Sequence, residues 1–417
     1  MDTRPAGGNA GWFFIGDVKR FYGDKYMKKL SILLVLALLL GCFAGCVPAV
    51  KEPAESTGSD QQESTGPSDT DAPEELTISC KGVNVRQMVV DYMLKMANVK
   101  WKAGTTIDYS KHSPTLVYRA GKTYLGVVYN NNKTGLEKFS SALDSSGTYV
   151  TDNTSWDDSV GNSCATSIEH AWQQVCPSIE YGYSKDMMPY YEDTGVLGVG
   201  DIDWSAYNGK NTNTILSAHN RNDIINSYAQ THAGDCLVRY WDTDGHAMMI
   251  TKEPEVCRNG DGSVNMVNSF LYVTDQTSTI NNRRECPSSW NVDRKMSFSD
   301  VWTAGYLPVT APELQSGVAP DASFELENIP TQDDMTKGFF SCTVKSNYCM
   351  NLVRLEILSG DKVVTSAEKH PYTRSFSFKV LGDAAGLNNL PSGEYTLKLF
   401  AEVGIGSITL AQIPFSK

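Results

Sequence analysis

The sequence predicts an α+β region followed by an all-β region. Apolar residues recur at helical spacing in residues 83–97 and 164–175, whereas short runs rich in β-branched and aromatic residues follow from residue 236 onward. Helices that precede antiparallel strands favour an α+β arrangement, and regularly spaced short strands at the end of the chain favour two packed sheets. A chain of 417 residues is long enough to form two separate hydrophobic cores.

The composition is that of a folded protein, with 41% hydrophobic and 20% charged residues. The chain has 36 Lys and Arg against 48 Asp and Glu, which gives a formal net charge of −12. A general nucleic-acid binder needs a basic face to replace the counterions of the phosphates. This charge balance therefore argues against nucleic acid as a partner.

The N-terminal part contains an export signal. Residues 30–40 (LSILLVLALLL) are an apolar run too short to span a bilayer, and Lys28 and Lys29 precede it. The segment MKKLSILLVLALLLGCFAGC resembles a bacterial lipoprotein signal, in which a cysteine after a small residue is lipidated and becomes the first residue. Cys46, which follows an Ala-Gly pair, is the favoured lipidation site. Cys42 is the alternative, and a cleaved signal without lipid is another.

The signal peptide is thus expected over residues 27–46, and residues 1–26 are expected to be an extension from a start site placed too early. Residues 47–77 contain eight acids and one lysine, which predicts a disordered acidic linker. A lipid anchor and this linker would hold the folded part at the extracellular face of a bacterial membrane. The lipid would be its only contact with that membrane.

The first folded region is expected over residues 78–311. It opens with the helix 83–97, and a stretch rich in Tyr, Gly and Asn leads to the helix 164–175. Residues 179–229 contain many turn residues. Three strands and a short terminal helix follow, and their expected bounds are 236–240, 246–251, 270–274 and 298–303.

The second folded region is expected over residues 319–417. Its alternating apolar runs, separated by turn residues, predict an antiparallel β-sandwich as in Ig-like modules. The expected strands are 323–326, 339–344, 352–358, 363–366, 375–380, 395–401 and 407–413. No catalytic pattern occurs here, and the sequence does not identify the ligand or partner of this module.

The sequence contains ten Cys and six His, and eight of the cysteines follow the signal. An exported protein could pair them; Cys342 and Cys349 could bridge a hairpin or remain unpaired. The absence of a CxxC spacing argues against structural zinc, and we expect neither a metal nor a cofactor. The segments 242–245 and 259–262 resemble calcium loops only in part, because neither has the distal glutamate, and tight turns are the preferred interpretation.

Cys164 is the candidate nucleophile. It follows the loop Gly161-Asn162-Ser163 and opens an amphipathic helix. The helix dipole and the free N–H groups at a helix N-terminus stabilise a thiolate, and the same N–H groups can bind an oxyanion. The alternative is a small buried residue without a chemical role.

His246 and Asp275 are the candidate partners of this thiol. His246 follows Gly245 and opens the apolar run AMMIT, where a strand would hold its imidazole rigidly near the helix. A third group should orient the ring. Asp275 and Gln276 follow the expected strand 270–274, and alternation lets only one of them face the histidine. Asp275 is preferred because a carboxylate would also stabilise the imidazolium.

These residues together resemble the NlpC/P60-type cysteine hydrolases. The match consists of the opening helix with Trp101, Cys164 at a helix start, Gly234-Asp235, Gly245-His246, and Asp275-Gln276. CHAP-type amidases share the layout and have an acidic third residue. Where the family has Asp-Cys-Ser-Gly, this chain has Ser163-Cys164-Ala165-Thr166. The long separation between Cys164 and His246 indicates an insertion over about residues 180–231.

The resemblance implies a papain-like fold and a cysteine peptidase or amidase. Cys164 would attack a carbonyl, His246 would move the proton, and Asp275 or Gln276 would fix the ring. The implied substrate is the peptide stem of cell-wall peptidoglycan, which a tethered extracellular lipoprotein would meet.

Two other functions remain open. The chain could be a non-catalytic surface lipoprotein that binds through a degenerate hydrolase fold and the sandwich. It could also transfer the acyl group to an amine, as transglutaminase-like folds do. Among the other histidines, His170 lies about 240° around the helix from Cys164 and is a poor base. His219 and His232 fall in the insertion and are expected to be surface or turn residues, or to line a lid.

Overall fold

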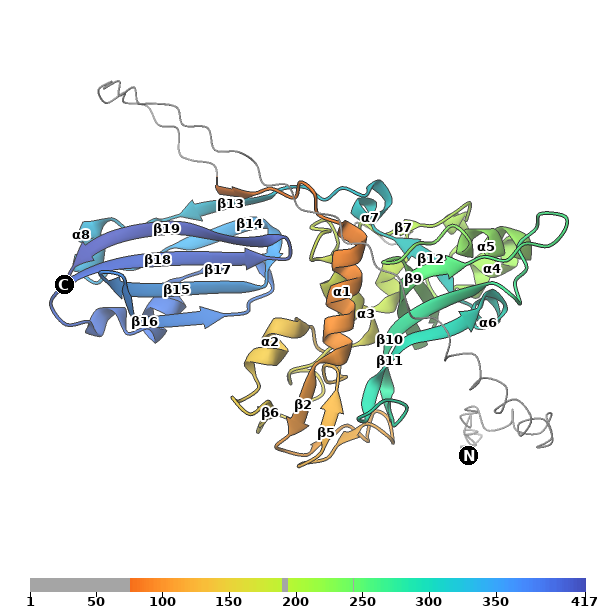
Figure 1. Ribbon diagram of the computed structural model, residues 1–417, viewed down its shortest axis with the longest axis horizontal. Coiled ribbons are helices and arrows are strands. Elements are labelled where there is room, and N and C mark those ends of the chain that lie inside the picture. Colours follow the sequence, from red (N-terminus) through yellow and green to blue (C-terminus); the bar gives the residue numbers. More distant parts are fainter. Residues whose placement is uncertain (1–75, 190–193, 243) are drawn as a thin grey trace, which may run out of the picture. The chain divides into compact units, whose positions relative to one another are not determined.

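The computed structural model describes residues 76–189, 194–242 and 244–417. The protein has a mixed α/β fold with several sheets and few long helices (Figure 1). Buried apolar side chains of the described residues form one cluster between Val85 and Ala319 and another between Ala322 and Phe415. The expected signal, Cys42 and Cys46, and residues 47–75 of the expected linker lie outside the described residues. No helix in the described part is long and apolar enough to cross a membrane.

Two helices lie against the large sheet of the first region. The helix α1 (Val85–Asn98) begins where the Asn84 side chain accepts a hydrogen bond from Gln87 N–H, and it buries one apolar face. The helix α3 (Cys164–Trp172) is buried along its whole length and packs against α1 and the central strands β9 and β10. It ends three residues before the expected Val175, and Pro177, which cannot continue a helix, follows soon after.

The large sheet has nine strands in the order β6-β2-β5-β11-β10-β9-β8-β12-β7. Consecutive antiparallel strands β8, β9, β10 and β11 form its centre. The bounds are β2 Lys100–Ala103, β5 Thr123–Leu125, β6 Thr148–Tyr149, β7 Leu197–Gly198, β8 Cys236–Trp241, β9 Asp244–Glu255, β10 Phe270–Asn281, β11 Ser288–Ser297 and β12 Leu307–Thr310.

Strand β10 is longer than the sequence predicts. The expected strand stops at Thr274, but Asp275 and Gln276 pair with Asn291 and Trp290 of β11, and the strand continues to Asn281. Its second half is rich in polar residues, which pattern analysis assigns to a turn. The two candidate orienting residues therefore lie inside a central strand rather than in a loop.

The C-terminal region consists of two four-stranded sheets that share the second hydrophobic cluster. One sheet has the order β1-β13-β14-β17 and the other β16-β15-β18-β19. The bounds are β1 Leu76–Ile78, β13 Ala322–Glu327, β14 Thr343–Met350, β15 Leu352–Ser359, β16 Lys362–Lys369, β17 Thr373–Ser377, β18 Glu394–Val403 and β19 Gly406–Ser416.

Three predicted boundaries in this part of the chain are wrong. Leu76–Ile78 pairs with β13, so the end of the expected linker and the first expected residue of the first region belong to the C-terminal sheets. Residues 339–342 precede β14 instead of opening it. Lys379 and Val380 begin the helix α9 (Lys379–Ala384) rather than end a strand.

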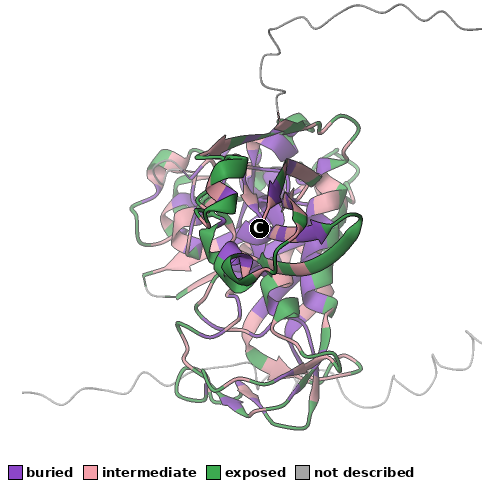
Figure 2. Cartoon of the chain, turned by 90° about the vertical axis from the view of Figure 1, so that its left-hand side faces the viewer, coloured by how far each residue is buried: buried purple, intermediate pink, exposed green. Residues whose placement is uncertain are grey.

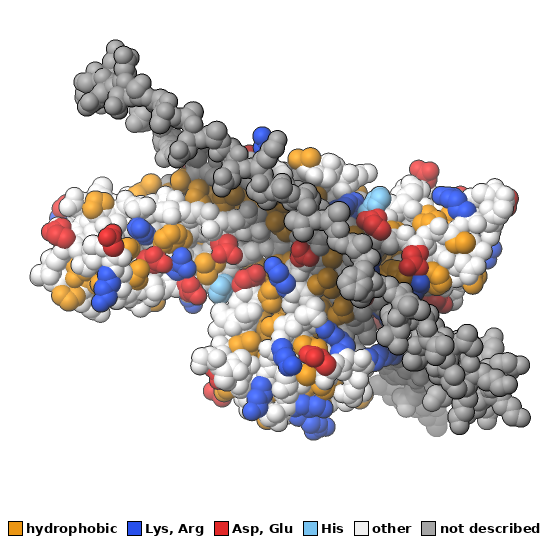
Figure 3. Space-filling view, viewed as in Figure 1, with side chains coloured by type: hydrophobic (Ala, Val, Ile, Leu, Met, Phe, Trp, Pro, Cys, Tyr) orange, Lys and Arg blue, Asp and Glu red, His pale blue; other side chains and the backbone are white. Residues whose placement is uncertain are grey.

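The remaining elements are short. They are β3 Ile107–Asp108, β4 Val117–Tyr118, α2 Gly135–Ser141, η2 Ser184–Met187, η3 Trp204–Ala206, α4 Asn213–Ala218, α5 Arg221–Tyr228, α6 Phe298–Thr303, α7 Pro312–Ser316, α8 Gln332–Thr336 and η4 Leu387–Asn389. Figure 2 shows buried residues concentrated behind an outer layer of exposed loops and strands. On the face shown in Figure 3, basic and acidic side chains are interspersed.

Candidate active site

Cys164 is the first residue of α3, so its thiol lies at the N-terminus of that helix. Ser163 caps the helix by accepting a hydrogen bond from Thr166 N–H, and Thr166 Oγ1 accepts one from Ser163 N–H. This reciprocal cap fixes the residue at which the helix begins, and with it the position of the thiol. Cys164 is only 6% exposed, and it lines a cavity of about 360 Å³.

The cavity next to Cys164 has walls from four parts of the chain. Its lining residues are Tyr129, Asn131, Ser163, Cys164, Ala165, Tyr183, Ser184, Lys185, Tyr240 and Gly245. The sequence does not single out Tyr129, Asn131 or Lys185, because these residues belong to no recognisable motif and lie in turn-rich segments. The helix η2 belongs to the expected insertion, which therefore supplies one wall of the cavity.

His246 reaches the thiol from the sheet. It lies on β9, opposite Arg239 of β8, and β9 packs directly against α3. The imidazole lies close enough to the Cys164 thiol for each group to shift the pKa of the other, through charge and through hydrogen bonding. Because His246 Nε2 contacts Asp275, the nitrogen that faces the sulfur is Nδ1.

Gly245 allows this approach because it has no side chain. A Cβ atom at this position would overlap Ser184 Oγ and would lie 2.9 Å from Cδ2 of Tyr240. The helix η2 therefore packs onto the backbone of β9 immediately before His246. The Gly-His pair seen in the sequence thus combines a steric requirement with a candidate base.

Asp275 holds the far side of the His246 ring. Its Oδ2 lies 3.0 Å from His246 Nε2, and the carboxylate is 1% exposed. Two side chains of β11 also donate to it: Asn291 Nδ2 at 3.3 Å from Oδ2 and Arg294 at 3.4 Å from Oδ1. The carboxylate is thus surrounded by donors, and it can fix both the tautomer and the orientation of the ring.

Gln276 points to the other face of β10, as alternation requires. Its Oε1 accepts a hydrogen bond from Ser167 Oγ at 2.8 Å, and its Nε2 donates to the Val127 carbonyl at 2.7 Å. Gln276 therefore ties α3 to the sheet and does not contact His246. Of the two alternatives left open by the sequence, the structure brings Asp275 to the histidine.

The electrostatics of the three groups favour a thiolate–imidazolium pair. Burial raises the pKa of the Cys164 thiol, but His246 and the N–H groups of Ala247 and Ala165 outweigh it and hold the pKa below 9.0. Burial lowers the pKa of His246, but Tyr306, Cys164 and Asp275 outweigh it and raise the pKa well above 6.5.

The same balance applies to the third group of the site. Burial raises the pKa of Asp275, but the hydrogen bond and charge of His246, with Arg294 and Asn291, outweigh it and keep the pKa below 3.8. Asp275 is therefore ionised at neutral pH, where His246 carries its proton.

The Gly234-Asp235 pair has a structural role in this fold. Asp235 is buried and forms an ion pair of 2.9 Å with Arg86 of α1. It also accepts hydrogen bonds from Thr310 Oγ1 at 2.6 Å and from His232 N–H at 2.7 Å. Asp235 thereby fastens α1 to β8 and β12, on which the site depends, without contacting the reacting groups.

The other histidines of the expected insertion do not line the cavity at Cys164. His219 Nε2 accepts a hydrogen bond from Asp203 N–H, and its Nδ1 faces the Ile215 carbonyl. His232 Nδ1 lies 2.9 Å from the Glu253 carboxylate. Both are therefore surface or turn residues, and the prediction that either could line a lid finds no support in these contacts.

All eight cysteines of the described residues are free. The possible bridge between Cys342 and Cys349 is therefore not formed. No group of His, Cys, Asp and Glu within the described ranges is arranged to hold a metal ion. The turn at residues 259–262 is closed by its own hydrogen bonds among Asn259, Asp261 and Ser263.

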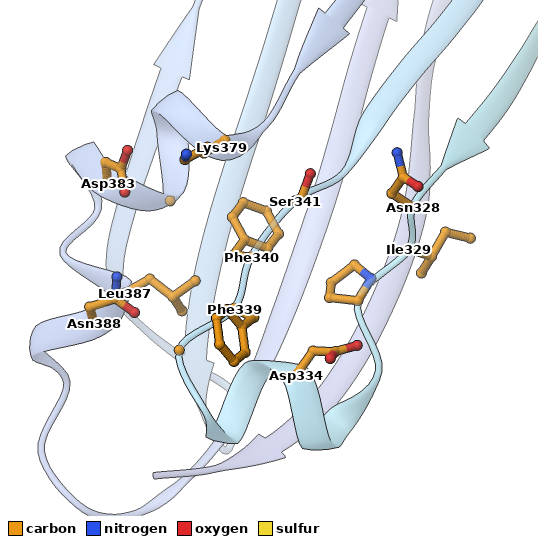
Figure 4. Close-up of a pocket in the computed structure, with 13 residues that line it drawn as sticks. Asn328, Ile329, Asp334, Phe339, Phe340, Ser341, Lys379, Asp383, Leu387 and Asn388 are labelled. Carbon is orange, nitrogen blue, oxygen red and sulfur yellow. The ribbon is translucent and has the colours of Figure 1, made fainter.

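A larger cavity of about 600 Å³ lies in the C-terminal region (Figure 4). It is formed by loops around α8, α9 and η4, and no candidate catalytic residue lines it. Phe339, which is 66% exposed, and Ile329 place apolar surface beside Asp334, Lys379 and Asp383. This cavity has the mixed surface of a binding site and no nucleophile–base pair.

Comparison with protein-family models, curated proteins and solved structures finds no match to this chain. The chemistry of the site is therefore inferred from its own geometry. A buried thiol at a helix N-terminus, an imidazole that interacts with it and a carboxylate behind the imidazole form a relay. Such a relay can generate a nucleophilic sulfur and return a proton to a leaving group.

Proposed function

We propose that this protein is a thiol hydrolase that cleaves amide bonds through Cys164, His246 and Asp275. The observation that carries the proposal is the continuous contact from the thiol to the imidazole to the buried carboxylate. Both ring nitrogens of His246 are used, and one of them faces a thiol beside an open cavity.

The proposed reaction begins when the Cys164 thiolate attacks the carbonyl carbon of the amide, forming a C–S bond and an oxyanion. The N–H of Ala165, at the free end of α3, lies next to this sulfur and supports the negative charge. His246 then donates its proton to the amide nitrogen as the C–N bond breaks. The amine leaves, and a thioester remains on Cys164.

Water completes the cycle. His246, now neutral, takes a proton from a water molecule as its oxygen attacks the thioester carbonyl. The C–S bond breaks, the acid is released, and the thiolate–imidazolium pair is restored. Asp275 stays ionised throughout and orients the ring at each transfer.

The proposed substrate is a peptide stem of peptidoglycan. This rests on the resemblance to NlpC/P60-type or CHAP-type hydrolases and on the lipoprotein-like signal, which would place the enzyme outside a bacterial cell. In this proposal the first region has a papain-like fold and the two C-terminal sheets form an Ig-like module. Lipidation at Cys46 is testable with radiolabelled palmitate, whose incorporation should be lost in Cys46→Ser and retained in Cys42→Ser.

A second candidate function is binding without catalysis. The cavity of about 600 Å³ in the C-terminal region favours it, because an exposed aromatic ring next to charged side chains suits a polar ligand with an apolar face. The Ser-Cys-Ala-Thr sequence at the candidate nucleophile also favours it. In this alternative Cys164 and His246 would be inert.

Alkylation rates separate the two functions. The purified chain, Cys164→Ala and His246→Ala would be treated with iodoacetamide near neutral pH, and the labelled thiols mapped by mass spectrometry. Cys257, which is more exposed than Cys164, serves as an internal reference for the rate of labelling. Labelling of Cys164 faster than Cys257, and slower in His246→Ala, supports the enzyme. If labelling of Cys164 does not depend on His246, the enzyme proposal fails and binding without catalysis is the supported function.

Product analysis then tests the reaction itself. Peptidoglycan fragments incubated with the wild-type chain should gain free amino and carboxyl groups, and Cys164→Ala should release none. An added primary amine distinguishes hydrolysis from acyl transfer. If most of the acyl product carries the added amine, transfer rather than hydrolysis is the activity.

A further inference from the structure

A third cavity lies beside the C-terminal part of α3, away from the thiol. It has a volume of about 440 Å³, whereas one water molecule occupies about 30 Å³ in the liquid. Its walls come from α3, from the segment just before α2, from the loop after α3, and from the C-terminal region. The lining residues are Lys133, Glu169, His170, Gln173, Glu180, Cys349, Pro371, Tyr372, Thr373 and Arg374.

His170 is a buried imidazole whose ring nitrogens have no hydrogen bond of ordinary geometry within the described residues, and the Lys133 backbone is at most a weak partner. It is 3% exposed, and the ring of Tyr372 packs against it edge-on. Burial, with the charges of Lys133 and Lys138, lowers the pKa of His170 to about 3, so the ring is neutral. A neutral imidazole presents one donor and one acceptor, and leaving both unpaired is costly.

Glu169 is a buried carboxyl of which only one oxygen is used. Its Oε1 accepts from Lys133 Nζ at 3.0 Å and from Tyr181 N–H at 3.2 Å. Its Oε2 is buried and has no hydrogen-bond partner in the described part of the chain. Burial raises the pKa of this carboxyl to about 7 despite Lys133. A cation in the cavity would pair with Oε2 and restore the ionised form.

Arg374 supplies an unmatched positive charge to the same cavity. It donates to the Pro177 carbonyl, but its Nε is buried without a hydrogen bond, and it has no ion pair among the described residues. The thiol of Cys349 is its neighbour. Glu180, at the exposed edge of the cavity, likewise has no ion pair in the described part. The cavity thus holds unpaired groups of both signs.

We propose that this cavity binds a small zwitterion, namely a free amino acid or the end of a short peptide. The ammonium group would donate to Glu169 Oε2 and to the acceptor nitrogen of His170, with Glu180 nearby. The carboxylate would accept from Arg374. Such a ligand would provide hydrogen-bond partners for the unpaired buried atoms and opposite charges for Arg374 and Glu180. Water could provide the hydrogen bonds, but it would leave both charges without a counter-charge.

Binding would act on the helix that carries the thiol, since Glu169 and His170 lie on α3 together with Cys164. The inference does not depend on Cys164 being catalytic. A binding measurement on Cys164→Ala, which cannot act as the proposed hydrolase, therefore tests this inference separately from the proposed function.

Calorimetric titration of the full chain tests the proposal. The probes are the common amino acids, D-alanine and Ala-Ala, with methylamine and acetate as ligands that carry one charge each. We expect at least one zwitterion to bind saturably, and methylamine and acetate to bind at least tenfold more weakly. Glu169→Gln and Arg374→Gln should each weaken binding at least tenfold, whereas Cys164→Ala and the exposed control Glu368→Gln should bind as the wild type does.

A second readout follows from the state of Glu169. Near pH 6, pairing with an ammonium group should release a proton, which appears as a dependence of the binding heat on the ionisation enthalpy of the buffer. Circular dichroism and the unfolding midpoint show whether each variant is folded. The proposal is overturned if no zwitterion binds to the folded wild-type chain. It is also overturned if folded Glu169→Gln and Arg374→Gln both bind with unchanged affinity.

Discussion

His246 and Asp275 lie on neighbouring antiparallel strands, and His246 Nε2 is 3.0 Å from Asp275 Oδ2. This contact leaves Nδ1 free to face Cys164. The order of the sheet explains the relationship, because β9 lies between β8 and β10 and packs against α3. A residue near the start of β9 can therefore face a helix N-terminus with one ring edge and a side chain of β10 with the other.

Asp275→Asn should slow alkylation of Cys164 and any amide hydrolysis by on the order of 100-fold, because the amide neither stabilises the imidazolium nor holds one tautomer as strongly. The matched control is Gln276→Glu, one residue away on the opposite face of β10. It should disturb the contacts to Ser167 and Val127 and so lower the unfolding midpoint. In the folded fraction of this variant, Cys164 should still be alkylated at close to the wild-type rate. Equal loss of Cys164 reactivity in both variants would contradict the assignment of Asp275.

The pH dependence of Cys164 alkylation should be broad. The lowered pKa of the thiol keeps thiolate present below its ordinary range, and the raised pKa of His246 keeps the imidazolium present above its own. Alkylation should therefore continue well below about pH 8.5, where a free thiol is mostly protonated. In His246→Ala, only the N–H groups of Ala247 and Ala165 still oppose the effect of burial on the thiol, so the profile should move to alkaline pH. Rates measured by mass spectrometry over the range from about pH 4 to about pH 10 would show this. A wild-type profile that follows that of free cysteine measured in the same buffers would contradict it.

Arg294 offers a milder test of the same carboxylate. Arg294→Gln removes a positive charge 3.4 Å from Asp275 Oδ1, so the pKa of Asp275 should rise. As the pH is lowered, the variant should therefore lose activity at a higher pH than the wild type does. Its rate near neutral pH should change only a few-fold. Arg294→Lys should restore part of the wild-type profile. A uniform decrease across the pH range in Arg294→Gln would point to a structural role instead.

The sequence was sufficient to single out Cys164 and His246, which the structure brings together, because both are marked by local signals. A capping serine before an amphipathic run fixes Cys164 at a helix start, and a glycine before an apolar strand marks His246. The choice between Asp275 and Gln276 depends on the register of β10 against β9. That register is set by pairing between distant segments and by the irregularity near Val273, which no local pattern records.

The cavity walls and the strand β1 were missed for a related reason. Tyr129 and Lys185 acquire their positions only from tertiary packing, with Lys185 carried on a helix of four residues. Leu76–Ile78 is a strand of three residues next to an acidic segment, and it becomes regular only by pairing with β13. Short elements of this kind carry too little periodicity to be recognised in isolation.

Gly245→Ala should destabilise the protein by about 1–3 kcal/mol, because the new methyl group overlaps Ser184 Oγ and η2 must move. The displacement should also lower the reactivity of Cys164, since η2 forms a wall of its cavity. Ser184→Gly in the same chain removes the overlapping atom and should recover part of both losses. Denaturant unfolding and alkylation rates of the single and double variants measure this coupling. Additive effects of the two substitutions would contradict direct packing of Ser184 on Gly245.

Glu169 should make the stability of the protein fall as pH rises toward neutrality. Burial raises the pKa of Glu169 from 4.5 to about 7. Between these values the folded state holds more protons at this carboxyl than the unfolded state, so this contribution favours folding at acid pH and is lost as pH rises to about 7. Glu169→Gln removes the titration and keeps an acceptor for Lys133 and Tyr181. The difference in free energy of unfolding between Glu169→Gln and the wild type should therefore shift in favour of Glu169→Gln from about pH 5 to about pH 8, by on the order of 3 kcal/mol.

Urea unfolding of both chains at the two pH values tests this prediction. Glu368→Gln is an exposed control, and its difference from the wild type should stay constant. A difference between Glu169→Gln and wild type that is the same at both pH values would show that Glu169 titrates normally, and that ions or water already satisfy its buried oxygen.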